Sequence, residues 1–294
     1  LAAKLGDEEA GLILGLQESR FLFLKRNYLK SIENTQLILS KSKIQSRQSI
    51  TAQCYQQLIE IYFQLGNYEE AVFYSEELTK IHRLKGDLES VAKSLSSIGD
   101  YFIKSSQTIK AVEFYKRSLE IYNELGNDKN ISRVEYSILI HSKTPQQFTQ
   151  NDITALQDLI NEYKKANDIE YIAMSVRYLG YIMFVLSEYG QAMEYLLESL
   201  EYSKSINQFT EEIDAFITLG AIYHETGDYE KAMVYVEKSI EKAKAAKNSY
   251  YISFGYNILW ELITDLNQNQ CALDSYRRAL NVSTEGKDSV FICW

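Results

Sequence analysis

Residues 216–232 read FITLGAIYHETGDYEKA, and this segment contains the plan on which the whole chain is built. Phe216, Leu219 and Tyr223 recur at intervals of three and four, which places them on one face of a helix. A polar Gly-Asp turn follows, and a second helix then carries the small residue Ala232 on its inner face. The segment therefore predicts two helices that are joined by a short turn.

The same small position recurs along the chain at a nearly constant spacing. It is occupied by Ser31, Ala71, Ala111, Ala192, Ala232 and Ala272. Neighbouring copies lie 40 residues apart, except for one step of 81 that spans two units. A fixed spacing of this size is typical of a solenoid of stacked helical pairs. The units are expected near residues 8–47, 48–87, 88–127, 128–167, 168–207, 208–247 and 248–287.

Five of these units resemble the tetratricopeptide repeat (TPR), whose pattern is W-x2-L-G-x2-Y followed by A-x3-F. Phe216-x2-Leu219-Gly220-x2-Tyr223 matches the first part and Ala232-x3-Val236 matches the second. The resemblance implies an all-α, right-handed TPR superhelix (α-solenoid) of about seven helix-turn-helix units. Such long repeats are similar to those of Rap- and NprR-type peptide receptors, LGN-type adaptors and the TPR sensory regions of bacterial signalling proteins. Small residues at Gly99, Gly180 and Gly220 are expected to let paired helices approach closely.

One unit, residues 128–167, departs from the pattern because it holds the single proline of the chain, Pro145. The residue before a proline disfavours the helical region, so a helix should stop at Thr144. Asn151 and Asp152 then offer a cap for a helix over residues 153–166. We expect this unit to be a kink or hinge in the superhelix.

The whole of residues 1–294 is expected to form a single array. Residues 1–6 resemble the tail of a preceding second helix, which ends at a Gly-Asp turn, and residues 289–294 would begin an eighth unit. Both ends therefore look truncated from a longer chain.

Composition narrows the classes of function. The net charge of −9 argues against a basic surface for nucleic acid. Three cysteines without CxxC spacing support neither a disulfide framework nor a structural zinc site. No apolar run has the length of a membrane span, and no signal peptide is visible. The expectation is a cytoplasmic protein that binds neither nucleic acid directly nor a membrane.

No catalytic constellation is evident. His82, His141 and His224 lie in three different units, and HExxH, GxGxxG and GxxxxGK[ST] are absent from the sequence. We therefore expect no catalytic residue, no metal and no cofactor, and predict that the chain is not an enzyme.

The candidate binding residues follow from the family pattern, in which the first helix of each unit lines a concave groove. They are Gln53, Gln56, Gln57, Glu60, Lys93, Ser97, Asp100, Arg177, Tyr178, Tyr181, Asp214, His224, Asn257 and Glu261. Amides both donate and accept hydrogen bonds, which suits an extended peptide backbone. Arg177 beside two tyrosines could hold a ligand carboxylate.

The resulting prediction is a non-catalytic module that captures a peptide or protein segment in its groove. Its expected context is the sensory or regulatory region of a bacterial signalling protein. Two alternatives stay open: an adaptor scaffold that joins two protein partners, and the sensory half of an attached cyclase, kinase or DNA-binding regulator. A homodimer through the array ends is a further expectation.

Overall fold

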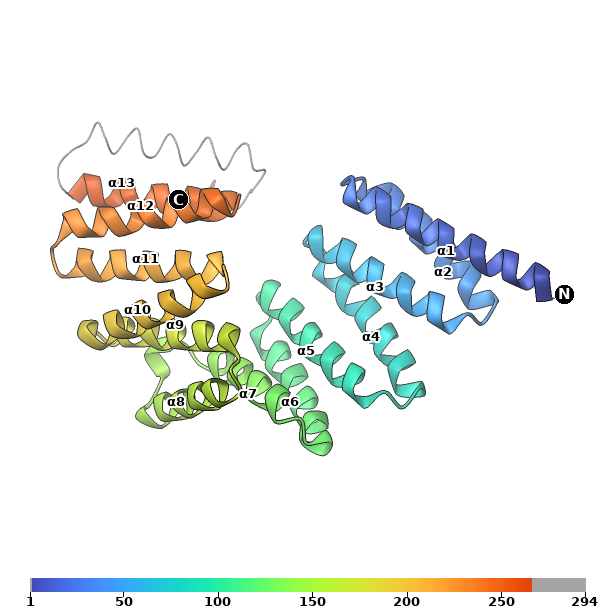
Figure 1. Ribbon diagram of the computed structural model, residues 1–294, viewed down its shortest axis with the longest axis horizontal. Helices are drawn as coiled ribbons and strands as arrows, with labels where there is room; N and C mark the ends of the chain where they lie inside the picture. The colour runs from blue at the N-terminus through green and yellow to red at the C-terminus, as the bar shows by residue number, and fades with distance from the viewer. Residues whose placement is uncertain (1, 266–294) are drawn as a thin grey trace. The chain divides into compact units, whose positions relative to one another are not determined.

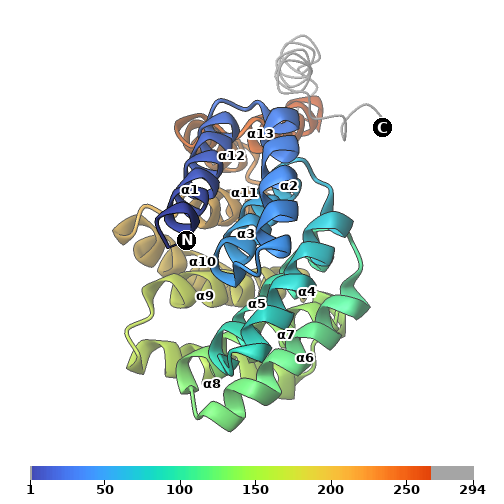
Figure 2. The same ribbon diagram turned by 90° about the vertical axis from the view of Figure 1, so that its right-hand side faces the viewer.

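The computed structural model describes residues 2–265, and these residues form thirteen α-helices and one 3₁₀ turn without a β-strand among them (Figures 1 and 2). In chain order the elements are α1 (Ala2–Leu24), α2 (Tyr28–Ile44), α3 (Gln48–Gln64), α4 (Tyr68–Leu84), α5 (Leu88–Lys104), α6 (Thr108–Leu125), α7 (Asp128–Ser142), η1 (Pro145–Gln147), α8 (Gln150–Lys165), α9 (Ile169–Val185), α10 (Tyr189–Ser205), α11 (Phe209–Glu225), α12 (Tyr229–Ala245) and α13 (Ser249–Asp265). The all-α helical-repeat fold expected from the sequence is confirmed.

The chain divides into two compact units, one ending at Ser142 and the other beginning at Lys143. Within each unit every helix packs against its neighbours along the chain. First helices of adjacent repeats also touch, as α1 and α3 do in the first unit and α9 and α11 in the second. The boundary lies inside the irregular repeat that contains Pro145.

A left-handed residue ends eleven of the helices and explains the repeat length. These residues are Arg26, Ser46, Gly66, Gly86, Ser106, Gly126, Asn167, Ser187, Asn207, Gly227 and Lys247. After each of them, the next backbone N–H donates to a carbonyl five residues earlier, as Asn27 does to Leu22 at 2.9 Å. This is the Schellman pattern of a helix end. A 17-residue helix and three turn residues repeat every 20 residues, so a pair of helices gives the 40-residue period.

The glycines expected at close helix contacts lie where a side chain would not fit. A β-carbon on Gly99 would lie 2.6 Å from Cε1 of Tyr115, and one on Gly180 would lie 2.9 Å from Cγ of Leu196. On Gly220 it would lie 2.9 Å from Cγ2 of Val236. These distances are too short for two carbons, so the expectation of close approach at the three glycines is confirmed.

Hydroxyl groups replace the glycine and alanine at the contact between α1 and α2. Ser19 donates to the carbonyl of Ser31 at 2.7 Å, and Ser31 donates back to the carbonyl of Ser19 at 2.8 Å. The hydroxyls of Ser19 and Thr35 lie 2.6 Å apart. All three side chains are fully buried, and their mutual hydrogen bonds satisfy the polar groups.

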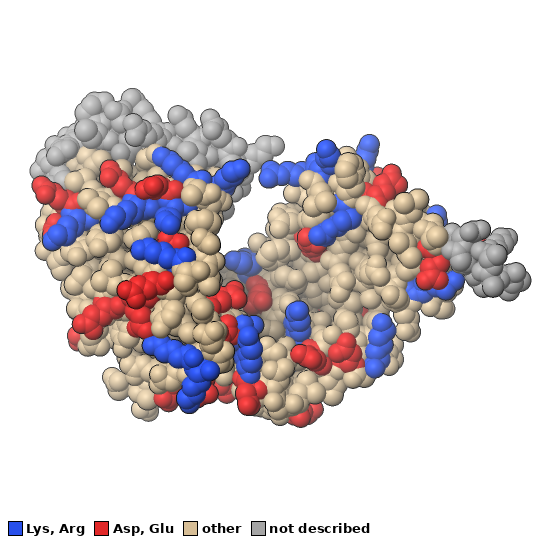
Figure 3. Space-filling view, in the orientation of Figure 1, with Lys and Arg blue, Asp and Glu red and all other residues tan. Residues whose placement is uncertain are grey.

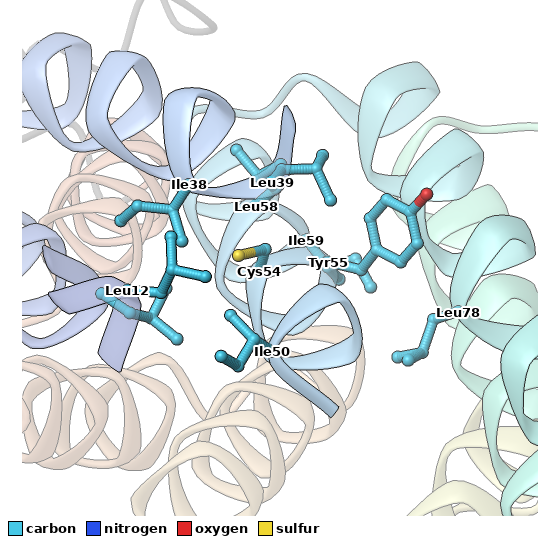
Figure 4. Packing of buried hydrophobic residues seen from close by; sticks show 10 residues of the cluster. Leu12, Ile38, Leu39, Ile50, Cys54, Tyr55, Leu58, Ile59 and Leu78 are labelled. Atoms are coloured by element: carbon cyan, nitrogen blue, oxygen red, sulfur yellow. The ribbon is translucent and has the colours of Figure 1, made fainter. Parts of the chain in front are cut away.

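An apolar cluster fills the space between α1, α2, α3 and α4, with Cys54 among Ile38, Leu39 and Ile50 (Figure 4). Cys54 is fully buried, and this burial raises the pKa of its thiol to about 12. The thiol is therefore protonated at neutral pH and unreactive. Cys271 and Cys293 lie outside the described residues.

Two sequence-based boundaries are wrong. Helix α1 runs through residues 2–24 without a break, so residues 2–6 belong to it and no turn follows them. Helix α8 begins at Gln150, three residues earlier than expected, because Thr149 forms a capping box with Asp152. Asp152 accepts from the Thr149 N–H at 2.8 Å and is held by Lys143 at 2.7 Å.

Candidate ligand-binding surface

A hollow of about 440 Å³ in the first unit brings together four of the residues predicted to bind a ligand. Gln56 and Glu60 lie one turn apart on α3, and Lys93 and Ser97 lie one turn apart on α5. Side chains four residues apart share one face of a helix, so each pair faces the same way. The two first helices thus present an amide, a carboxylate, an ammonium and a hydroxyl to one space.

The rest of this hollow was not foreseen from the sequence. It is lined by Ile59, Phe63, Ser75, Leu78, His82, Ser90, Ser94 and Tyr101. The rings of Phe63 and Tyr101 lie 5.2 Å apart and give it an apolar wall. His82 comes from the second helix α4, which the family pattern did not assign to the groove. Its position one turn after Leu78, a core residue facing α3, could have revealed it.

The charged side chains of the hollow differ in whether the protein already pairs them with an opposite charge. Glu60 forms an ion pair with Arg20 of α1, and its charge is therefore already compensated. Nδ1 of His82 lies 3.7 Å from the carboxylate of Asp87. Lys93 is exposed and makes no ion pair with any residue that the structure describes. Its ammonium group is the cation that a ligand would meet.

Three predicted residues on α3 and α5 lie outside the hollow. Gln57 is only 6% exposed, and its amide donates to the hydroxyl of Ser19 at 2.9 Å. The expectation that Gln57 points into a groove is therefore wrong, because this side chain ties α3 to α1. Asp100 accepts a hydrogen bond from Tyr115 of α6 at 2.6 Å. Gln53 is exposed on α3.

Helix α9 carries a row of aromatic rings in the second unit. Tyr178, Tyr181 and Phe184 follow at intervals of three, with ring centroids 6.3 and 6.4 Å apart. Phe148 extends the row from one end at 6.1 Å, and Tyr189 extends it from the other at 6.1 Å. Burial raises the pKa of Tyr178 to about 12, so its hydroxyl stays protonated.

A charged cluster adjoins this row on α9, α11 and α13. The guanidinium of Arg177 forms an ion pair with Glu211 and lies 3.9 Å from the carboxylate of Asp214. Tyr251 contributes a hydrogen bond to Asp214. Burial raises the pKa of Asp214, while Arg177 and Tyr251 oppose the rise. The expectation that Arg177 holds a ligand carboxylate is not supported, because two carboxylates of the protein already face it.

The other predicted residues of the second unit lie farther along α11 and α13. Nε2 of His224 lies 2.8 Å from Oδ2 of Asp265, so this side chain links the two helices. Asn257 is half-buried and Glu261 is exposed on α13. The structure therefore groups Arg177, Tyr178, Tyr181 and Asp214 and leaves His224 in a separate pair.

Three general features bear on the chemistry. Among the described residues, no group of three or more His, Cys, Asp and Glu side chains could hold a metal ion. None of the helices in residues 2–265 has the length and apolar character needed to cross a membrane. On the face shown in Figure 3, acidic and basic side chains are interspersed over the described surface of each unit.

Comparison with known proteins agrees with the repeats. Family models described as tetratricopeptide repeat match residues 48–124 and residues 213–245. A search among curated proteins found no match.

Several solved structures are similar to this chain. The apo form of RapI matches with a TM-score of 0.71 and 12% identity over 95% of this chain and 100% of that one. Aspartyl phosphate phosphatase F from Bacillus subtilis matches with a TM-score of 0.68 and 14% identity over 94% of this chain and 73% of that one. NprR in complex with its cognate peptide NprX matches with a TM-score of 0.64 and 14% identity over 98% of this chain and 90% of that one. At these identities the likeness concerns the fold. Residues 48–124 and 213–245 are tetratricopeptide repeats, and the described chain has the tetratricopeptide-repeat fold.

Proposed function

We propose that this chain is a non-catalytic module that captures a peptide or protein segment on the surface of its first helices. The observation that carries the proposal is the convergence of Gln56, Glu60, Lys93 and Ser97 in the hollow of the first unit. An extended peptide presents one N–H and one C=O per residue, and this set of side chains offers both donors and acceptors to such a backbone. The uncompensated ammonium of Lys93 would attract a ligand carbonyl or carboxylate.

The fold comparison supports the same class of ligand. NprR, which shares the fold, was solved in complex with its cognate peptide NprX. A helical repeat buries its apolar stripes between neighbouring repeats and leaves an extended surface of first helices for binding. This arrangement suits a segment of chain better than a compact small molecule.

The second unit adds a different preference. The aromatic row of α9 favours apolar or aromatic ligand side chains. The cluster around Arg177 contains one cation and two carboxylates, Glu211 and Asp214, so its own charges sum to a negative value. We infer that a ligand places a cationic or neutral group here, since a further carboxylate would meet repulsion.

The proposed setting is the regulatory part of a bacterial signalling protein in the cytoplasm, without direct contact to nucleic acid. One protein with a similar fold, aspartyl phosphate phosphatase F, is named as an enzyme. The absence of catalysis here therefore stays a prediction. A homodimer through the array ends also stays a prediction, and sedimentation at several protein concentrations is its test.

The proposal can be tested by selecting binders from a random-peptide display library with the purified chain. The enriched peptides are then titrated against Gln56→Ala/Lys93→Ala, which removes one hydrogen-bonding group from each side of the hollow. Gln64→Ala/Lys116→Ala is the matched control, because both of its sites are exposed and lie outside the lining. We expect about a tenfold or greater loss of affinity for the first variant and none for the control. Equal affinities for both, or no enrichment at all, would contradict the proposal.

A further inference from the structure

A second hollow, of about 310 Å³, lies on another side of the first unit, between the second helices α4 and α6. Its lining residues are Glu76, Thr79, Lys80, Arg83, Leu95, Ile98, Phe114 and Arg117. Leu95, Ile98 and Phe114 are buried and form an apolar floor. It shares none of its lining with the hollow at Gln56 and Lys93.

Two of the three basic groups that line this hollow are not neutralised by the described part of the protein. Arg83 and Arg117 form no ion pair with any described residue. The guanidinium of Arg117 lies over the ring of Phe114 at 4.7 Å from its centroid, which holds it at the edge of the apolar floor. Lys80 is paired with Glu77, and Glu76 is the acidic residue among those that line the hollow. Two guanidinium groups therefore face this space against one carboxylate.

The repeat register sets Arg83 and Arg117 apart from two charge pairs at the same positions of other second helices. In the second unit the residues 34 positions apart on successive second helices, Lys164 and Glu198, form an ion pair of 2.8 Å. Lys43 and Glu77 have the same separation in the first unit. The pKa of Glu77 is lowered mainly by its hydrogen bond with Lys80 and, to a smaller extent, by the charge of Lys43. On α4 and α6 the corresponding residues are Arg83 and Arg117. The position of the carboxylates Glu77 and Glu198 therefore holds a second cation at Arg117, as it also does at Lys238 on α12.

We propose that this hollow binds an acidic segment of a partner protein. The carboxylates of the segment pair with Arg83 and Arg117, and an apolar side chain between them contacts the floor at Phe114. Arginine binds carboxylates through two parallel hydrogen bonds, and the apolar floor makes these bonds stronger by excluding water. Charge complementarity identifies this partner, because the two arginines without an ion pair outnumber the single carboxylate of the lining. The inference does not depend on the proposed function of the first helices.

Fluorescence anisotropy with a labelled peptide tests the proposal. The probe is a short peptide with a Glu-Leu-Glu core, and its analogue has a Gln-Leu-Gln core. Arg117→Glu is the decisive variant, because it recreates the cation and carboxylate pair of Lys164 and Glu198 and should leave the fold intact. We expect it to weaken binding of the acidic probe by about tenfold or more.

Three further variants make the result specific. Arg83→Gln should also weaken binding, whereas Glu76→Gln should strengthen it, a gain that a misfolded protein would not produce. Lys85→Gln/Lys116→Gln is the matched control, since it removes two exposed cations of the same unit that lie outside the lining of this hollow. The proposal is overturned if the wild-type chain binds both peptides equally. It is also overturned if Arg117→Glu binds as the wild type does, or if the control loses as much affinity as Arg117→Glu.

Discussion

At the scale of single residues, the absence of one carbon sets how closely the paired helices approach. Gly99 lies against the ring of Tyr115. The hydroxyl of Tyr115 donates a hydrogen bond to Asp100, and its ring stacks on the ring of His141. Each of these groups depends on the position of one tyrosine ring. A small change of side-chain size at Gly99 should therefore change the free energy of unfolding.

Replacing Gly99 with alanine should destabilise the chain by about 1–3 kcal/mol, because the new methyl group would lie 2.6 Å from Tyr115. Gly190→Ala is the matched control, since nothing lies within 4 Å of a β-carbon there. Because Gly190 is the second residue of α10, this control should be neutral or stabilise by at most about 0.5–1 kcal/mol. Urea unfolding followed by circular dichroism measures both, and a neutral Gly99→Ala would show that the contact is looser than described.

His141 should make stability depend on pH. Its ring stacks on Tyr115 with centroids 6.1 Å apart, and burial lowers its pKa below the ordinary value. The unfolded chain therefore binds a proton more readily than the folded one, so stability is present above about pH 6.5 and is lost as the pH falls. His141→Phe should flatten this part of the profile of unfolding free energy against pH. An unchanged slope in the variant would assign the pH dependence to other groups.

Residue types predicted part of the candidate binding surface, and tertiary packing decided the rest. Gln56 and Lys93 face the hollow as the repeat register indicates. Gln57 could not be excluded from the sequence, because its burial depends on Ser19, 38 residues away. The pairing of Arg177 with Glu211 was hidden for the same reason, since it joins two repeats.

At the scale of helices, the 20-residue spacing is more regular in the turns than in the residues of the helix faces. Every left-handed turn residue after α1–α6 lies 20 residues from the previous one, although only some are glycine. A glycine turn such as Gly227 is visible in the sequence, while a turn at Ser46 is hard to recognise because serine rarely adopts this conformation. The start of α8 was misplaced because the threonine cap at Thr149 competes with Asn151 as a capping residue.

The strained turns predict a stabilising substitution. Ser187 has a φ of 64°, which costs about 1 kcal/mol for a residue with a β-carbon and little for glycine. Ser187→Gly should therefore raise the free energy of unfolding by up to about 1 kcal/mol. Ser205→Gly, at the last residue of helix α10, is the control and should lower it. A loss of stability in Ser187→Gly would mean that the serine side chain contributes more than the strain costs.

At the scale of the whole molecule, the fold could be predicted because one pattern is repeated and each copy supports the same conclusion. The division into two compact units could be suspected only from the irregular repeat around Pro145. The chemistry of the surface was harder to foresee, since it arises where side chains of different repeats meet. The pair Arg83 and Arg117 is visible in the sequence only after the second helices are aligned with Lys164 and Glu198.

The central claim, that the first helices capture a peptide, is tested most directly by hydrogen exchange. The chain is measured by mass spectrometry with and without a peptide that was selected on it. We predict slower backbone amide exchange in α3 and α5, around Gln56 and Lys93. Exchange in α6, which does not line this hollow, should change less. Protection confined to α4 and α6, with unchanged exchange in α3 and α5, would contradict the claim and move the site away from the first helices.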